Sequence, residues 1–210
     1  MNIIFLGAPG AGKGTQSEIV SNEYNIPAIS TGVLLREAMK AGTELGKSAE
    51  SYVQSGGLVP DDIVIGIIKE RLKQSDCANG YILDGFPRTV TQAKALDDIV
   101  REVDYVIYVD LSDSLLLKRM TTRRICSNCN SIFNVVTFPP KVEGVCDNCN
   151  APLVQRPDDN ETSVSERIAI YHKMTEPVIE YFEEKGLLVR VSGEGNVDDI
   201  TNAIFAALES

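Results

Sequence analysis

Five short apolar runs recur along the chain, and the segments between them carry apolar residues at helical spacing. The runs lie at residues 2–6, 27–30, 80–84, 105–110 and 187–191. Each is strand-sized and almost continuously apolar, which is typical of parallel strands that are buried on both faces. The pattern therefore predicts an α/β fold, with a doubly wound, parallel, five-stranded sheet and helices on both of its faces.

Two long stretches interrupt this alternation. Residues 30–60 carry no strand signal and show only short helical patterns, around residues 34–39 and 45–53. Residues 126–159 hold four cysteines, two adjacent prolines and several β-forming residues. We therefore expect a helical insert at the first stretch and a small β-rich insert at the second.

Composition and charge argue against a nucleic-acid-binding protein and against a membrane protein. The 210 residues include 20 basic and 30 acidic ones, which gives a formal net charge of −10. A broad nucleic-acid surface needs a clustered excess of Lys and Arg, so we expect no nucleic-acid partner, whereas a small anion held in one cleft is compatible. The apolar runs are too short to cross a membrane, and the N-terminus has no basic leader. We expect a cytoplasmic protein without a membrane partner.

A glycine-rich segment carries the first candidate chemistry. Residues 7–15, Gly-Ala-Pro-Gly-Ala-Gly-Lys-Gly-Thr, follow the first predicted strand and open a helical segment. In this context backbone N–H groups and a helix N-terminus surround a phosphate group, and Lys13 supplies a positive charge. Gly14 separates Lys13 from the hydroxyl of Thr15, which favours a magnesium ion held mostly through water. The alternative is a glycine-rich turn without a ligand, which the order of strand, loop, lysine and helix disfavours.

A carboxylate ends the third predicted strand. Ligands of open parallel sheets sit at the carboxyl ends of the strands, so Asp84 is expected to face the phosphates and to orient hydrated magnesium. A helix N-cap is the alternative role for Asp84. Arg88 follows it, and a single arginine of this kind is more typical of a surface ion pair than of a ligand. Further arginines of the same kind are Arg36, Arg123, Arg124, Arg156 and Arg167.

Four of the five cysteines form two closely spaced pairs, Cys126 with Cys129 and Cys146 with Cys149. This spacing is typical of a four-thiolate zinc site, which would be structural because it leaves no open coordination position. Two disulfides are the alternative, and they are disfavoured because nothing in the sequence indicates an oxidising compartment. No role is predicted for Cys77, which stands alone.

The ordered motifs of the chain resemble those of adenylate kinases, in the long-lid bacterial form. The resemblance implies reversible, magnesium-dependent phosphoryl transfer from ATP to AMP, giving two ADP. The nearest alternative is another nucleoside monophosphate kinase that acts on UMP, CMP or GMP. A P-loop switch or ATPase that binds partners is an alternative from another class, and the lack of a guanine-recognition motif disfavours a GTPase. A zinc-ribbon nucleic-acid binder is disfavoured by the acidic balance and by the lack of an aromatic–basic stripe. The motifs are at residues 7–16, 30–32, 57–61, 84–89, 123–126 and 155–160.

The resemblance also implies roles for individual positions. The catalytic residues that it implies are Lys13, Asp84, Arg88, Arg123, Arg156 and Arg167. The ATP site that it implies consists of Gly10, Ala11, Gly12, Lys13, Gly14, Thr15, Arg123, Ile132, Phe133 and Gly195. The AMP site that it implies consists of Thr31, Arg36, Gly57, Leu58, Val59, Gly85, Phe86, Pro87, Arg88, Gln92, Arg156 and Arg167.

The domain organisation implied by the resemblance explains both interruptions of the strand–helix alternation. The core comprises residues 1–29, 60–123 and 162–210, residues 30–59 form a mobile AMP-binding insert, and residues 124–161 form a lid that carries structural zinc. Two positions depart from the family pattern, which usually has aspartate in place of Val33 and glycine in place of Thr122. We expect the first departure to bear on AMP affinity. We expect a monomer, because no extra apolar face remains once the core is assigned.

Overall fold

A five-stranded parallel sheet forms the centre of the molecule in the computed structural model, which describes residues 1–55, 57–100 and 102–209. The predicted core and inserts also contain Gly56, Arg101 and Ser210, which lie outside the described residues. The sheet order β2-β3-β1-β4-β8 confirms the predicted α/β fold class, and each strand lies within a residue of its predicted position. The strands are β1 Asn2–Leu6, β2 Ala28–Ser30, β3 Tyr81–Asp84, β4 Tyr105–Asp110 and β8 Leu188–Ser192.

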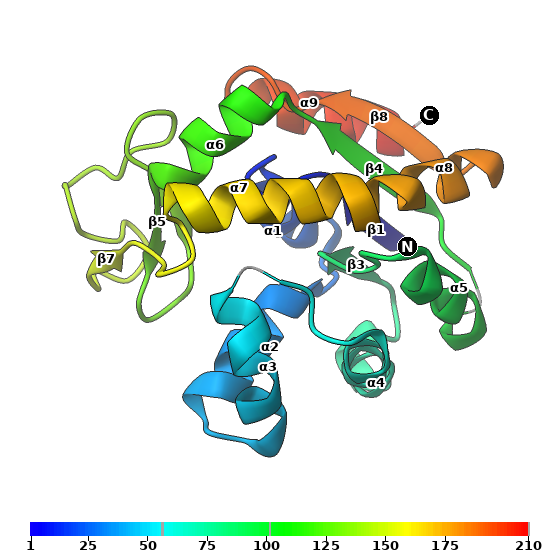
Figure 1. Cartoon of the computed structure of the whole chain (residues 1–210). Helices are drawn as coiled ribbons and strands as arrows, with labels where there is room; N and C mark the ends of the chain where they lie inside the picture. The colour runs from blue at the N-terminus through cyan, green and yellow to red at the C-terminus, as the bar shows by residue number, and fades with distance from the viewer. Residues whose placement is uncertain (56, 101, 210) are drawn as a thin grey trace.

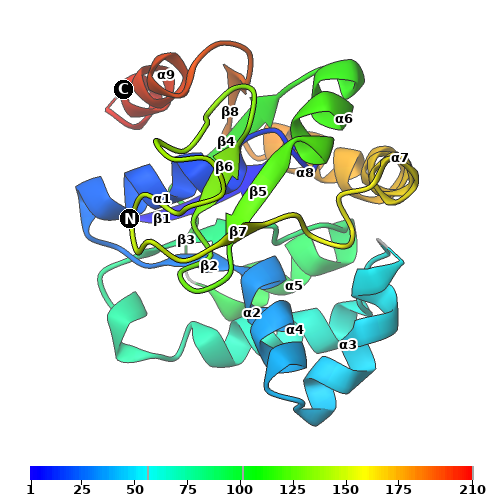
Figure 2. The same cartoon turned by 90° about the vertical axis from the view of Figure 1, so that its left-hand side faces the viewer.

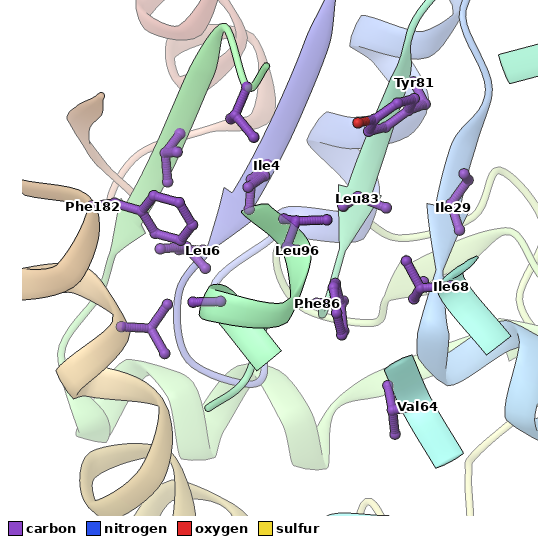
Figure 3. Packing of buried hydrophobic residues seen from close by; sticks show 14 of the residues in the cluster. Ile4, Leu6, Ile29, Val64, Ile68, Tyr81, Leu83, Phe86, Leu96 and Phe182 are labelled. Carbon is purple, nitrogen blue, oxygen red and sulfur yellow. The ribbon is translucent and has the colours of Figure 1, made fainter. Parts of the chain in front are cut away.

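Both faces of the sheet are buried, which explains why its strands are almost continuously apolar. Successive side chains of a strand point to opposite faces. Ile4 and Leu6 accordingly pack in one hydrophobic cluster, shown in Figure 3, whereas Ile3 and Phe5 pack in the other. On the Ile4 face the covering helices are α4 Asp61–Arg71, α5 Val90–Ile99 and α8 Glu176–Glu184. On the Ile3 face they are α1 Lys13–Tyr24, α6 Asp113–Thr121, α7 Glu161–Ile170 and α9 Val197–Leu208.

Two groups of elements project from this core at separate places, at the bottom and at the left of Figure 1. The first is a helical pair, α2 Thr31–Lys40 and α3 Glu44–Gln54. The second is an antiparallel sheet in the order β6-β5-β7, which faces the viewer in Figure 2. Its strands are β5 Arg123–Cys126, β6 Ile132–Asn134 and β7 Leu153–Val154. These groups occupy the two stretches in which the strand–helix alternation of the sequence breaks.

The remaining connections are short. A 3₁₀ turn, Ser75–Cys77, precedes β3, and a π-helical segment, Tyr171–Thr175, joins α7 to α8. The last helix is capped by Asn196, whose side chain accepts a hydrogen bond of 2.9 Å from the backbone N–H of Asp199. Among the described residues, no helix has the length and apolar character that crossing a membrane requires.

Candidate active site

The loop between β1 and α1 requires glycine for its shape. Gly7 has φ of 140° and Gly10 has φ of 88°, in the left-handed region that other residues rarely adopt. A Cβ on Gly7 would lie 2.5 Å from the carbonyl oxygen of Val109, and one on Gly10 would lie 2.7 Å from the Met120 side chain. The loop can therefore pack closely against β4 and α6 only without side chains at these positions. It leads into the N-terminus of α1, whose first N–H groups have no partner within the helix.

Lys13, the first residue of α1, folds back over the loop. Its Nζ donates hydrogen bonds of 2.8 Å to the carbonyl oxygen of Gly7 and 2.9 Å to that of Ala8. Burial, opposed by Asp84 and reinforced by nearby arginines, lowers the pKa of Lys13 to about 8. The ammonium therefore sits among cations with too little negative charge around it. A bound anion would relieve that imbalance.

A cavity of about 550 Å³ lies in front of the loop, within the size range of small-ligand sites. It receives side chains from the sheet edge, from α2 and from the β5–β7 sheet. Two residues of the implied sites, Ala11 and Phe86, are fully buried and line no described cavity, and Figure 3 shows Phe86 within the hydrophobic core. The implied site residues that line the cavity are Gly10, Gly12, Lys13, Gly14, Thr15, Arg36, Leu58, Asp84, Gly85, Pro87, Arg88, Arg123, Ile132, Phe133, Arg156, Arg167 and Gly195.

A smaller cavity of about 70 Å³ lies beside the first and shares Arg36, Arg88 and Arg167 with it. It lies between α2 and the loop that follows β3. Val33, one of the two departures from the family pattern, lines the larger cavity, whereas Thr122 at the end of α6 accepts a hydrogen bond of 3.0 Å from Asn134. The implied site residues found only at the smaller cavity are Thr31, Gly57, Val59 and Gln92.

Arginines dominate the electrostatics of the larger cavity. Burial lowers the pKa of Arg36, Arg88, Arg156 and Arg167, because each guanidinium loses water without gaining a full complement of anions. The Nε of Arg156 is buried and has no hydrogen-bond partner within the described part of the chain. Such a cluster favours a ligand with several negative charges, because guanidinium groups bind phosphate through paired hydrogen bonds.

Two aspartates hold part of this cluster in place, and sequence reasoning missed both roles. Asp159, which is fully buried, accepts hydrogen bonds from Nε and Nη2 of Arg123 and lies 3.4 Å from Nη1 of Arg167. Asp158 accepts a hydrogen bond of 2.8 Å from the same Arg167 nitrogen. The only available signal was their position within the motif at residues 155–160. Arg119 was also missed; it lines the cavity and donates a hydrogen bond of 2.9 Å to the carbonyl oxygen of Gly193.

The residues at and after the end of β3 lie between the two cavities, and Gly85 and Arg88 line both of them. Thr31 Oγ1 and Arg88 Nε each donate a hydrogen bond of 2.8 Å to the carbonyl oxygen of Gly85. Asp84 lines the larger cavity, as the strand-end argument predicts. The alternative role of Asp84 as a helix cap is wrong, because α5 begins at Val90 and its cap is Thr89.

The four paired cysteines form one cluster in the β5–β7 region, with all four sulfurs within 4.8 Å of one another. The Cys126 and Cys149 sulfurs lie 3.4 Å apart, and those of Cys129 and Cys146 lie 3.6 Å apart. A tetrahedron with zinc–sulfur bonds of about 2.3 Å places its sulfurs about 3.8 Å apart, whereas a disulfide needs about 2 Å. The cluster therefore could hold a zinc ion. Cys77 lies far from this group in sequence; it is buried, and burial raises the pKa of its thiol.

Comparison with known proteins agrees with this geometry. The family model described as adenylate kinase matches residues 5–187. A protein named adenylate kinase from Caldicellulosiruptor saccharolyticus is 51% identical, with 99% of each chain covered. A protein of the same name from Archaeoglobus fulgidus is 51% identical, over 100% of this chain and 98% of the relative. Another, from Acetivibrio thermocellus, is 49% identical, over 99% of this chain and 98% of the relative. The chain therefore belongs to the adenylate kinase family, and its activity is that of an ATP:AMP phosphotransferase.

Proposed function

We propose that phosphoryl transfer between ATP and AMP takes place in the larger cavity, with ATP on the glycine-loop side and AMP toward the smaller cavity. The observation that carries this assignment is the convergence of Lys13 and several arginines on one cavity. These cations come from the core, from α2, from β5 and from the segment that follows β7. Their combined charge matches the triphosphate of ATP facing the monophosphate of AMP, two anionic groups that repel one another unless cations lie between them.

On the ATP side, the glycine loop supplies backbone N–H groups and α1 supplies its N-terminus. Lys13 would exchange its two carbonyl partners for phosphate oxygens, because an ammonium binds an anion more strongly than a neutral carbonyl. The β5–β7 sheet adds Arg123 and the apolar side chains of Ile132 and Phe133. The residues assigned to ATP are Gly10, Ala11, Gly12, Lys13, Gly14, Thr15, Arg123, Ile132, Phe133 and Gly195.

On the AMP side, the smaller cavity would hold the base, and the arginines that it shares with the larger cavity would hold the phosphate. Gln92 lies at the smaller cavity and Arg88 at both, so Gln92 would contact the base and Arg88 the phosphate. Phe86 acts from the core by supporting the loop. The residues assigned to AMP are Thr31, Arg36, Gly57, Leu58, Val59, Gly85, Phe86, Pro87, Arg88, Gln92, Arg156 and Arg167.

The chemistry needs no general base. The acceptor oxygen of AMP is already ionised, so the protein has only to align the two nucleotides and to neutralise charge on the transferred group. Lys13, Arg88, Arg123, Arg156 and Arg167 would do this from both sides of the cavity. Water must also be excluded, since it would accept the phosphoryl group in place of AMP. Closure of the α2–α3 and β5–β7 groups, residues 30–59 and 124–161, over the core of residues 1–29, 60–123 and 162–210 would achieve that exclusion.

Two metal ions fit the donor groups present. Adenylate kinases use magnesium with ATP, and Asp84 at the cavity is the carboxylate suited to hold the hydrated ion, which neutralises phosphate charge. The four thiols of Cys126, Cys129, Cys146 and Cys149 match a structural zinc site in the lid. Free thiols are typical of a reducing compartment, which supports a cytoplasmic location. We expect the protein to act as a monomer.

A panel of acceptors tests the assignment. The kcat/KM for AMP, UMP, CMP and GMP is measured with ATP and magnesium, and AMP is expected to be the best acceptor. Higher kcat/KM for UMP, CMP or GMP would show that the base site is wrongly assigned. Replacement of Arg88 by Lys keeps one charge but removes paired hydrogen bonding, so it is expected to lower kcat/KM for every acceptor. Unchanged kinetics of Arg88→Lys would exclude the residue from the site.

A further inference from the structure

The side-chain amide of Gln92 is held in one orientation by two groups of opposite hydrogen-bonding character. Its Nε2 donates a hydrogen bond of 2.8 Å to Oδ1 of Asp61, and its Oε1 accepts one of 2.7 Å from the backbone N–H of Arg88. A carboxylate oxygen only accepts and a backbone N–H only donates. The two neighbours therefore define which end of the amide is oxygen and which is nitrogen.

Asp61 is itself held in place. It is the first residue of α4, and its second carboxylate oxygen accepts a hydrogen bond of 2.9 Å from Thr89 Oγ1. The Thr89 hydroxyl also caps α5, because it accepts a hydrogen bond of 3.1 Å from the backbone N–H of Gln92. Thr89 and Gln92 are 5% and 2% exposed, so water cannot readily replace these bonds. Asp61, Thr89 and Gln92 thus form a closed network behind the smaller cavity.

The network leaves part of the amide free for a ligand. A carboxamide has two N–H donors and two acceptor positions on its oxygen. Asp61 uses one donor and the Arg88 N–H uses one acceptor position, so within the described part of the chain one donor and one acceptor remain on a side chain that lines the smaller cavity. The same two hydrogen bonds also determine which side of the amide presents the remaining donor and which side presents the remaining acceptor.

Purine bases differ in what they present to such an amide. Adenine carries an N–H donor at its 6-position and an acceptor at N1, whereas hypoxanthine and guanine carry an acceptor at the 6-position and a donor at N1. An amide free to rotate by half a turn could pair with either pattern. An amide of fixed polarity can pair with only one.

We propose that Asp61 is a specificity-determining positioning residue, which fixes the polarity of the Gln92 amide so that the site accepts a 6-aminopurine monophosphate and rejects a 6-oxopurine monophosphate. The proposal rests on the assignment of Gln92 to the AMP base site. It adds a residue that need not touch the nucleotide and that acts through another side chain. It also gives the hydrogen bond between α4 and α5 a role in substrate selection.

The test compares AMP with IMP, which differ only at the 6-position and N1 of the base. In Asp61→Asn the new amide can donate or accept, so only the backbone N–H of Arg88 still favours one orientation of Gln92. The AMP-to-IMP ratio of kcat/KM is expected to fall by about tenfold, mainly through KM, because one hydrogen bond of the pair is lost or replaced. Asp62→Asn is the matched control, since Asp62 is the exposed neighbour in the same first turn of α4, and its ratio is expected to stay at the wild-type value.

The results distinguish a role of Asp61 in specificity from a purely structural role and from a wrong assignment of the base site. A lower melting temperature of Asp61→Asn with an unchanged AMP-to-IMP ratio would overturn the proposal and leave Asp61 a purely structural role. If Gln92→Ala also leaves the ratio unchanged, the base-site assignment itself fails; if Gln92→Ala lowers it and Asp61→Asn does not, only the role of Asp61 fails. Asp61→Ala, which removes the acceptor altogether, replaces Asp61→Asn where that variant does not fold. Equal use of AMP and IMP by the wild-type protein would overturn the proposal without any variant.

Discussion

Replacement of Asp159 by Asn removes the negative charge that holds the arginines of the larger cavity together. Asp159 is fully buried and accepts two hydrogen bonds from Arg123, while Arg167 lies 3.4 Å away. The substitution keeps the size of the side chain. It leaves Arg123 facing other cations without its counter-charge, so we expect a loss of stability and a change in the response to nucleotide.

The magnitude follows from the contacts. Breaking a buried pair costs about 3–5 kcal/mol, and hydrogen bonds to charged groups contribute about 1.5–3 kcal/mol each. Arg123 lines the cavity, so water can recover part of its solvation, and we expect a loss of about 2–3 kcal/mol in the free energy of unfolding. For a chain of this length that loss lowers the melting temperature by about 4–12 °C.

Thermal unfolding followed by circular dichroism measures the effect, without nucleotide and with saturating ADP. Phosphate groups would supply the missing negative charge, so the difference from the wild type is expected to shrink when ADP is bound. Glu70→Gln is the control, because Glu70 pairs with Lys73 on the surface, where an ion pair contributes little. A wild-type melting temperature for Asp159→Asn would show that Asp159 does not stabilise the arginines, and a difference that ADP leaves unchanged would show that bound phosphate does not replace its charge.

Three further predictions concern the lid and Lys13. The purified protein is expected to hold about one zinc per chain. Cys129→Ser is expected to lower both the metal content and the melting temperature of the lid while the core stays folded. Two intact disulfides in mass spectrometry would contradict the zinc site. Lys13→Met is expected to lower kcat by about a hundredfold or more, with Lys47→Met, at an exposed site, as the control; near-normal turnover of folded Lys13→Met would exclude the role. Because the pKa of Lys13 is lowered to about 8 and a bound phosphate would raise it, nucleotide binding is expected to take up a proton at about pH 9 but not at about pH 6, and to weaken as the pH rises through about 8. Calorimetry in buffers of different ionisation enthalpy measures that proton, and observed binding heats that are the same in every buffer at the higher pH would contradict the prediction.

The central sheet could be predicted from the sequence because its signal is local. Each strand is a short run that needs both faces covered, so the apolar pattern alone locates it, and the structure places all five strands within a residue of those runs. The loop before Lys13 could also be predicted from the sequence. The close approach of Gly7 to the Val109 carbonyl leaves no room for a side chain and so requires glycine at that position. A structural requirement that only one residue type can meet can be recognised in the sequence from that residue.

The connections between distant side chains could not be predicted in this way. Asp159 meets Arg123 across 36 positions of sequence, and Asp61 meets Gln92 across 31. Aspartates and arginines are common on protein surfaces, so neither residue type nor spacing distinguishes these pairs from exposed ones. Only the packing of β5 against the segment that precedes α7, and of α4 against α5, brings them together. Phe86 illustrates the converse, since a residue within a recognisable motif lies in the core and lines no described cavity.

The fate of the terminal phosphate of ATP shows whether the protein transfers it to AMP or to water. ATP labelled in its γ-phosphate is incubated with AMP, magnesium and the purified protein, and the products are separated and counted. The label is expected to pass to the β-phosphate of ADP formed from AMP, with almost none released as inorganic phosphate, because the proposed site would align the two nucleotides and exclude water. Label released mainly as inorganic phosphate, with AMP unchanged, would contradict this expectation.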